Sequence, residues 1–89
     1  MTQENLKTVE IYTLDYCPYC QKAKFFFDEH KVKYTEIPCD DNEEEMRKKL
    51  SEKYNLESLA TFPQIIIDNE NIGGYSDLIT KYQKGEIIF

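Results

Sequence analysis

The sequence predicts a single α/β domain over residues 1–89, in which a four-stranded mixed sheet is flanked by three helices. The chain has 89 residues, a length that suits one domain, and 40% of them are hydrophobic. Strand and helix patterns alternate along its N-terminal part, and two short strands and a helix follow. This order, β-α-β-α-β-β-α, is typical of a sheet with both parallel and antiparallel pairs, covered by helices. The polar residues 1–7 are expected to form a flexible N-terminus.

The first strand and the first helix are predicted on either side of a short connection. Residues 8–14 alternate between apolar and polar side chains and then become apolar, which indicates a strand with a buried end. Pro18 begins a helical segment that extends to about residue 31, since proline is well tolerated at the first helical position. One face of this helix carries four side chains at helical spacing, namely Ala23, Phe26, Phe27 and His30.

A second strand and a second helix follow. Residues 32–39 have a β-type pattern, and Pro38 indicates where the strand ends. Asn42 and Glu45 have the spacing of a capping box, so a helix is expected to begin there. This helix is predicted to bury a stripe formed by Met46, Leu50 and Tyr54.

The C-terminal part is predicted to form a hairpin and a last helix. Residues 63–68 have the strongest strand pattern in the chain. Residues 68–71 are predicted to form a turn, and residues 72–73 can form a short returning strand. Ser76 is expected to be the N-cap of the last helix, which Gly85 ends.

Composition and charge exclude several classes of function. The net charge is −6, and an acidic chain is not expected to bind nucleic acid or anionic membrane surfaces. The sequence has no apolar run near the roughly 18 residues of a spanning helix, and no signal peptide is expected. We therefore expect a cytoplasmic protein. In that reducing compartment three cysteines are poor material for structural disulfides, and a Cys-x-x-Cys pair indicates redox or metal chemistry.

The pair is formed by Cys17 and Cys20. Cys17 is expected at the N-cap of the first helix, with Cys20 one turn further on the same side. A free cysteine with a pKa of about 8.5 is mostly thiol at neutral pH, whereas the thiolate is the nucleophile. The helix dipole contributes about 0.3–1 kcal/mol, which lowers a pKa by less than about one unit. Amide hydrogen bonds must supply the rest. We predict that Cys17 is the nucleophile and that Cys20, deeper in the helix, is the resolving thiol.

Two other roles for the pair are disfavoured. A zinc site would need Cys39 and His30 as further ligands, but His30 lies about 15 Å along the helix from Cys20. Both cannot bind one ion at roughly 2.0–2.3 Å, so no metal is expected. A purely structural disulfide would close a very short loop and gain little entropy.

Three motifs together resemble the glutaredoxin family. Residues 11–13 followed by Cys17-Pro18-Tyr19-Cys20 are similar to the opening of a dithiol glutaredoxin. Residues 61–63 resemble its Thr-Val-Pro motif, with Phe in place of Val, and residues 73–77 resemble its Gly-Gly-x-x-Asp motif. The motifs extend from the first strand to the last helix. The resemblance implies the thioredoxin fold and glutathione as reducing co-substrate, with no bound cofactor.

The resemblance also implies which residues bind glutathione. A cis peptide before Pro63 would turn the backbone of Phe62 toward Cys17, where it could pair with glutathione as a short strand does. The free amides of the last helix would suit the γ-glutamyl carboxylate, and Asp77 would bind the amino group. The full expected set is Tyr19, Thr61, Phe62, Pro63, Gly74, Ser76 and Asp77.

The sequence departs from the family where basic residues are usual. Leu14 and Asp15 stand before the cysteine motif, and Leu59 and Ala60 before the proline motif. In the family these basic residues hold the glycine carboxylate of glutathione, and this chain lacks them. Asp15 is expected to raise the pKa of Cys17. Three lysines are candidates to supply the missing charge, namely Lys22, Lys24 and Lys53.

We expect a glutathione-dependent enzyme that reduces protein disulfides and glutathione mixed disulfides, and that is a monomer. The resemblance alone suggests ribonucleotide reductase as a client. Two alternatives stay open: a carrier of an iron–sulfur cluster ligated with glutathione, and a redoxin reduced by thioredoxin reductase. Cys39 is expected to be a buried small apolar residue, with a regulatory thiol as the alternative. Residues 87–89 are expected either to pack on the core or to contact a partner.

Overall fold

The computed structural model describes residues 7–89, so the expected flexible N-terminus lies outside the described residues except for Lys7. The order of elements agrees with the prediction. They are β1 (Val9–Thr13), α1 (Pro18–Glu29), β2 (Thr35–Pro38), a 3-10 turn (Asp40–Asn42), α2 (Glu43–Lys53), β3 (Gln64–Ile67), β4 (Glu70–Gly73) and α3 (Tyr75–Gln83).

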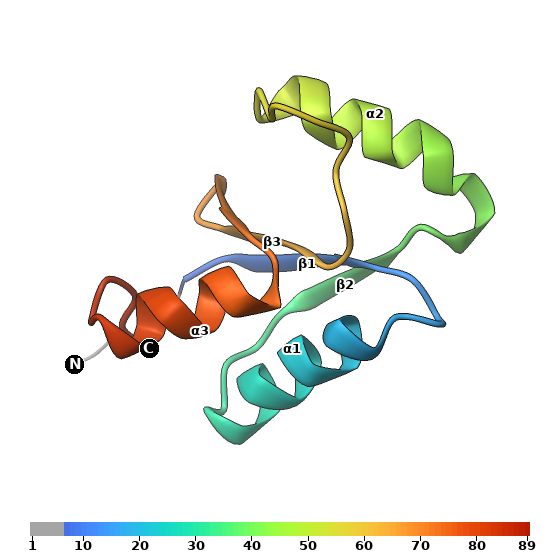
Figure 1. Cartoon of the computed structure of the whole chain (residues 1–89). Helices are drawn as coiled ribbons and strands as arrows, with labels where there is room; N and C mark the ends of the chain where they lie inside the picture. The colour runs from blue at the N-terminus through green and yellow to red at the C-terminus, as the bar shows by residue number, and fades with distance from the viewer. Residues whose placement is uncertain (1–6) are drawn as a thin grey trace.

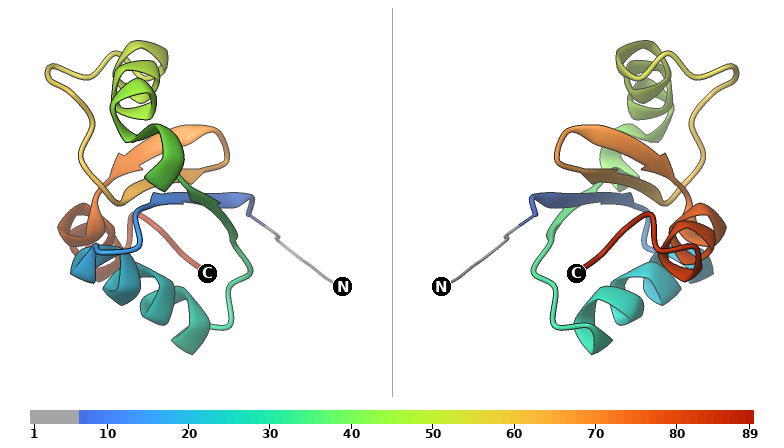
Figure 2. Two further views of the ribbon diagram at one scale, coloured as in Figure 1. Left: turned by 90° about the vertical axis from the view of Figure 1, so that its right-hand side faces the viewer. Right: turned by 90° about the vertical axis from the view of Figure 1, so that its left-hand side faces the viewer.

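The four strands form one mixed sheet in the order β2-β1-β3-β4. β1 pairs with β2 in parallel, while β3 is antiparallel to both β1 and β4. Helices α1 and α3 cover one face of the sheet and α2 covers the other (Figures 1 and 2). No helix of the described residues is long and apolar enough to cross a membrane.

Two groups of buried side chains fill the interior. The larger group is formed by β1, β3, α1, α3 and the C-terminal segment, with Ile11, Phe27, Ile65 and Leu78 all fully buried. At about 1.5–3 kcal/mol for each such side chain, this group is a main source of stability. The smaller group consists of Leu14, Cys17, Cys20 and Cys39. The cysteine pair is therefore anchored in the interior beside the end of β1.

Two of the last three residues, Ile87 and Phe89, pack on the core. Ile87 is buried in the larger group. The ring of Phe89 lies 5.6 Å from that of Phe27 and 6.1 Å from that of Phe26, in edge-on arrangements that suit aromatic pairs. Ile88 points outward and is 72% exposed.

One predicted helix cap was wrong, and the other is confirmed in position but lacks the expected side-chain hydrogen bond in the part of the chain that the structure describes. α3 begins at Tyr75 with Gly74 as its N-cap, so Ser76 lies inside the first turn. The amide of Gly74 donates to the Asp77 carboxylate at 3.0 Å. The capping hydrogen bond at the start of α3 is therefore made by a side chain inside the helix and not by Ser76. Asn42 does precede α2, but among residues 7–89 its side chain makes no cap hydrogen bond. The 3-10 turn runs directly into α2 and replaces a side-chain cap.

The β3–β4 turn is shorter than predicted. Asp68 and Asn69 alone form it, both with positive φ, whereas Glu70 and Asn71 already belong to β4. Such two-residue turns match the twist of the strands and favour Asn and Asp. The turn lies at the end of the sheet opposite to the cysteine pair, since Ile67 pairs with Val9 at the start of β1.

Candidate active site

Cys17 lies between the end of β1 and the start of α1, at the predicted N-cap. Its backbone is extended, and its Sγ accepts a hydrogen bond from the amide of Cys20 at 3.1 Å. Pro18 is the first residue of the helix and has no amide hydrogen to satisfy. The first turn of α1 therefore directs a backbone donor at the Cys17 sulfur, which is where a thiolate needs one.

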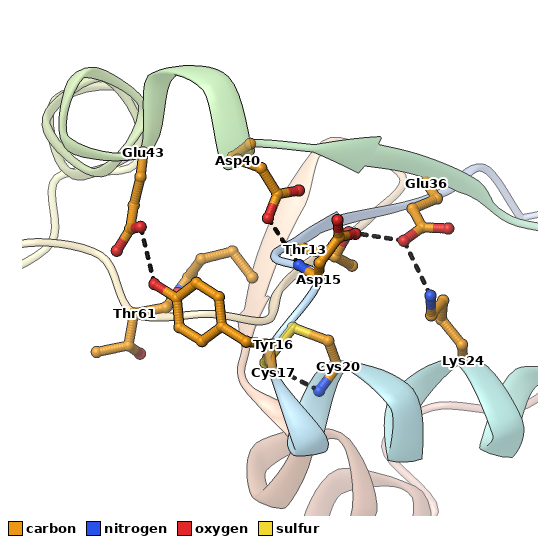
Figure 3. Close-up of a disulfide and its surroundings, with 12 residues drawn as sticks. Thr13, Asp15, Tyr16, Cys17, Cys20, Lys24, Glu36, Asp40, Glu43 and Thr61 are labelled. Atoms are coloured by element: carbon orange, nitrogen blue, oxygen red, sulfur yellow. Dashed lines mark hydrogen bonds and ion pairs between the residues drawn. A yellow bond between two sulfur atoms is a disulfide. The ribbon is translucent and has the colours of Figure 1, made fainter.

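Cys17 and Cys20 form a disulfide, with Cα atoms 5.2 Å apart (Figure 3). The two residues differ in access to solvent: Cys17 is 8% exposed, whereas Cys20 is fully buried. An incoming sulfur can therefore reach Cys17 first. The sequence predicted this difference because Cys20 lies one turn deeper in the helix.

A cavity of about 290 Å³ is lined by Tyr19 of the cysteine motif and by Phe62, which packs against the buried group that holds the cysteine pair. It collects all seven residues that the resemblance implied for glutathione, together with one that the sequence analysis missed. The lining residues are Tyr19, Thr61, Phe62, Pro63, Gly74, Tyr75, Ser76 and Asp77. The Phe62–Pro63 peptide bond is cis, as expected. Tyr75, the missed residue, faces Tyr19 with ring centres 6.1 Å apart.

The glycine that the backbone requires at this site is Gly73. Its φ of +111° is a conformation that L side chains rarely adopt, and an added Cβ would collide with the Asp77 carboxylate. An added Cβ at Gly74 would meet only the Pro63 carbonyl oxygen, at an ordinary 3.5 Å. Gly73 thus lets Asp77 fold back over the start of α3, whereas Gly74 leaves room on the cavity side.

Of the three candidate lysines, Lys22 is the one beside the cavity. Its Nζ lies 5.2 Å from the centre of the Tyr19 ring, and Tyr19 lines the cavity. Lys24 pairs with Glu36 at 2.9 Å, and Lys53 lies over the Tyr54 ring. A cation within about 6 Å of an aromatic ring is attracted by its face, so Lys22 can place positive charge near a bound anion.

Acidic side chains border Cys17 on the side of the 3-10 turn (Figure 3). The amide of Asp15 donates to Asp40 Oδ1 at 2.8 Å, and the hydroxyl of Tyr16 donates to Glu43 Oε1 at 2.8 Å. The Tyr16 bond raises the pKa of the phenol, because it stabilises the neutral, donating form. The pKa of Glu43 is lowered by its hydrogen bonds from Arg47 and then from Tyr16.

Sequence analysis missed Arg47, which contacts the segment before the cis proline. Its Nη1 donates to the carbonyl oxygen of Ala60 at 2.8 Å, and its Cζ lies 4.9 Å from the centre of the Phe62 ring. The i, i+4 spacing from Glu43 could have predicted the ion pair between them. The contacts with Ala60 and Phe62 depend on how a loop returns to the sheet, which no local pattern reveals.

Cys39 is buried, as predicted, at 1% exposure. Burial raises the pKa of its thiol, and the charge of Asp40 adds to this effect. The group is therefore a neutral thiol near pH 7, beside the redox pair but shielded from solvent. Within residues 7–89, no three His, Cys, Asp or Glu side chains gather as metal ligands would.

These features define a class of protein. A cysteine pair at the start of a helix, beside a cis-proline segment, on a four-stranded sheet with three helices, is the arrangement of thiol–disulfide oxidoreductases with the thioredoxin fold. Comparison with known proteins narrows this class to a family.

The Glutaredoxin family model matches residues 9–72. Glutaredoxin 1 of Rickettsia bellii is 40% identical to the chain over 87 residues, and this alignment covers 98% of the chain and 89% of that protein. The chain is similar to the structure of Glutaredoxin 1 from Francisella tularensis complexed with cacodylate, with a TM-score of 0.74, 32% identity and coverage of 90% and 96%. A buckwheat glutaredoxin–glutathione complex, at 24% identity, has a TM-score of 0.75 with coverage of 90% and 72%, and shows likeness of fold.

The chain therefore belongs to the glutaredoxin family. It is a glutathione-dependent thiol–disulfide oxidoreductase with a redox-active cysteine pair. The comparisons favour neither alternative, the cluster carrier nor the redoxin served by thioredoxin reductase.

Proposed function

We propose that Cys17 attacks disulfides in client proteins and in glutathione mixed disulfides, and that glutathione then restores the reduced pair. The observation that carries this proposal is the position of the Cys17 sulfur. It lies at the helix N-cap, accepts the Cys20 amide at 3.1 Å, and is the more exposed of the two sulfurs. A cysteine so placed has the thiolate character and the access that the reaction needs.

The reaction consists of four thiol–disulfide exchanges, two that reduce the client and two that restore the reduced pair. The Cys17 thiolate attacks a client sulfur, forms a mixed disulfide and releases the other client thiol. Cys20 then attacks the Cys17 sulfur, which releases the second client thiol and forms the Cys17–Cys20 disulfide. One glutathione thiolate reopens this bond at Cys17, and a second attacks the glutathione sulfur to give glutathione disulfide. Two electrons pass from two glutathione molecules to the client.

The cavity lined by Tyr19 and Phe62 is our proposed site for glutathione. The backbone of Phe62 would pair with its cysteinyl residue, and the first amides of α3 would bind the γ-glutamyl carboxylate. Asp77 would bind the amino group, and Tyr19 and Tyr75 would flank the ligand. Lys22 is the candidate to attract the second carboxylate. The complex of the buckwheat protein with glutathione supports this choice of ligand.

We also propose a monomeric, cytoplasmic enzyme without nucleic-acid or membrane partners. Its clients are disulfide-containing proteins, and ribonucleotide reductase is the client that the family resemblance suggests. The net charge of −6 argues against binding to nucleic acid and to anionic membrane surfaces.

A glutathione-coupled disulfide reduction assay tests these roles. Cys17→Ser is expected to abolish activity, since the attacking sulfur is lost. Cys20→Ser is expected to lose reduction of protein disulfides but to keep reduction of glutathione mixed disulfides, because glutathione itself can resolve that intermediate. Full activity of Cys17→Ser would refute the assignment. A brown colour after anaerobic purification would instead favour the cluster carrier.

A further inference from the structure

Two chain segments border the redox pair, and both are attached to the same helix. The cysteine segment, residues 14–17, leads into α1, and the proline segment, residues 60–63, leads into β3. The two are far apart in sequence. α2 covers one face of the sheet, and the loop after it brings the proline segment back to the sheet (Figures 1 and 2). Side chains of α2 that reach both segments can therefore set how far apart the segments stand.

Two consecutive residues attach the cysteine segment, one to the 3-10 turn before α2 and the other to the first residue of α2. The Asp15 amide donates to Asp40 in the 3-10 turn at 2.8 Å. The Tyr16 hydroxyl donates to Glu43 Oε1, also at 2.8 Å, and Figure 3 shows this bond reaching across from the cysteine loop to the helix. Since Tyr16 directly precedes Cys17, this attachment acts next to the reacting sulfur.

Arg47 attaches the proline segment one turn further along α2. Its Nη1 donates to the Ala60 carbonyl oxygen at 2.8 Å, and the Ala60 amide donates back to the Arg47 carbonyl oxygen at 3.5 Å. The guanidinium also covers the Phe62 ring at 4.9 Å. Ala60 is 1% exposed, so the carbonyl that Arg47 satisfies is shielded from water and depends on this donor.

Glu43 joins the two attachments. Its Oε2 accepts from Arg47 Nη2 at 2.7 Å and from Nε at 3.3 Å, while its Oε1 accepts from Tyr16. One oxygen of the Glu43 carboxylate thus binds Tyr16 of the cysteine segment, and the other binds Arg47, which holds the proline segment. The planar fork of an arginine fixes direction as well as distance, which a lysine ammonium does not.

We propose that Arg47 is a positioning residue that sets the separation between the Phe62 backbone and the Cys17 sulfur. It thereby makes the enzyme prefer disulfides that carry a peptide group beside the reacting sulfur. This inference rests on the proposed function, in which the Phe62 backbone pairs with the cysteinyl part of the substrate. Small disulfides without peptide groups do not use that pairing and gain nothing from the separation.

The test measures single-turnover oxidation of the reduced protein by three disulfides. Glutathione disulfide carries peptide groups and negative charge. Dithiodipropionate carries negative charge without peptide groups, and bis(2-hydroxyethyl) disulfide carries neither. In each reaction the Cys17 thiolate takes one half of the disulfide and releases the other as a thiol, and Cys20 then releases the first half. The three rates separate peptide recognition from attraction of charge.

Arg47→Met is expected to slow the reaction with glutathione disulfide about tenfold, since a misplacement of reacting groups by about 1 Å can cost as much as about a hundredfold. The rates with the other two disulfides should change little. Arg47→Lys should lose the preference almost as far, because the charge stays but the fork is lost. Lys49→Met is the matched control: Lys49 pairs with Glu45 on the same helix at 3.9 Å, both 65% exposed.

The outcomes distinguish the inference from the function on which it rests. If the wild type does not prefer glutathione disulfide, peptide recognition in the cavity is refuted. If the wild type prefers it but Arg47→Met slows all three reactions equally, the residue has a general structural role and the inference is wrong. Equal losses with the two charged disulfides alone would show that Arg47 acts by its charge. Should Arg47→Met fail to fold, Arg47→Lys carries the same comparison.

Discussion

At the scale of single residues, the sulfur of Cys17 has an acidic neighbour where a basic one is usual in the family. Asp15 precedes it by two residues, and the Asp15 amide is held by the Asp40 carboxylate at 2.8 Å. A negative charge near a thiol disfavours the thiolate. The structure shows an amide donor from Cys20 that stabilises the thiolate, and we expect the charge of Asp15 to oppose it.

We expect Asp15→Asn to lower the pKa of Cys17 by a few tenths of a unit, about the size of a solvent-screened interaction between charges. The pH dependence of alkylation of the reduced Cys17 thiol measures this shift. Glu70→Gln removes the same charge at the opposite end of the sheet and serves as the control. An unchanged pKa in Asp15→Asn would mean that the carboxylate is too well solvated to act on the sulfur.

Lys22 is the residue from which we expect an effect on glutathione affinity. Its ammonium lies over the Tyr19 ring, beside the proposed site. Lys22→Met should raise the KM for a glutathione mixed disulfide about twofold at low salt, and the effect should vanish near 1 M salt, where the screening length is about 3 Å. Steady-state kinetics at both salt concentrations measure it. Equal effects at both would indicate lost packing against Tyr19 instead of lost attraction.

At the scale of elements, the start of α3 determines the shape of one side of the cavity. Gly73 ends β4 with a φ of +111°, and Asp77 folds back to accept the Gly74 amide at 3.0 Å. Strand, turn and helix follow one another here with no linking residues beyond Gly74. The compact connection brings the first amides of α3 to the cavity, where they face the proline segment.

Gly73→Ala is expected to lower the free energy of unfolding by about 1–3 kcal/mol, because the new methyl group would adopt an unfavourable φ and collide with Asp77. Thermal or urea unfolding measures the loss. Gly85→Ala is the matched control: Gly85 also has a positive φ, of +76°, but an added Cβ would meet none of the described residues within 4 Å. A loss no larger at Gly73 than at Gly85 would show that Asp77 moves aside easily.

Local sequence predicts the elements well, but it does not predict contacts between distant segments. Pro18 and the spacing of Ala23 and Phe27 specify α1, because helix start and buried face are local properties. The N-cap of α3 was misplaced because a side chain three residues on, Asp77, satisfies the first amide. The role of Arg47 was missed for a related reason: its partners lie on a loop that reaches α2 only in the folded chain.

At the scale of the whole molecule, the sheet carries the redox pair at one end and the hairpin turn at the other. The pair sits where α1 begins, at the end of β1 away from the Asp68–Asn69 turn. The order of elements was predictable because the strands and helices each have a local pattern of apolar and polar residues. The two faces of the sheet have different roles. Helices α1 and α3 pack in the larger buried group on one face, and α2, on the other face, binds the segments around the cysteines (Figure 1).

Acid is expected to weaken the hydrogen bonds that two carboxylates, those of Glu36 and Glu43, accept from neighbouring elements. Glu36 on β2 accepts hydrogen bonds from Thr13 at 2.7 Å and from Lys24 at 2.9 Å, and these bonds, that of Thr13 first, lower the pKa of its carboxyl group. Hydrogen bonds from Arg47 and then from Tyr16 also lower the pKa of the Glu43 carboxyl group. A carboxyl group whose pKa is lower in the folded than in the unfolded state stabilises the fold above its unfolded pKa. That contribution is lost as the pH falls through the folded value.

We therefore expect the free energy of unfolding of the oxidised protein to be constant around neutral pH and to fall below a pH of about 4.5, the ordinary pKa of these carboxyl groups. The loss from Glu36 alone should be below about 1 kcal/mol, because the Glu36 side chain is 36% exposed and its interactions are screened by solvent. Urea unfolding at pH 7 and at pH 3.5 measures the difference. Glu36→Gln should be less stable than the wild type at neutral pH, and the gap should narrow in acid, since protonation removes the same charge. A gap that stays constant with pH would show that the Glu36 carboxylate acts by its shape and hydrogen bonds and not through its ionisation.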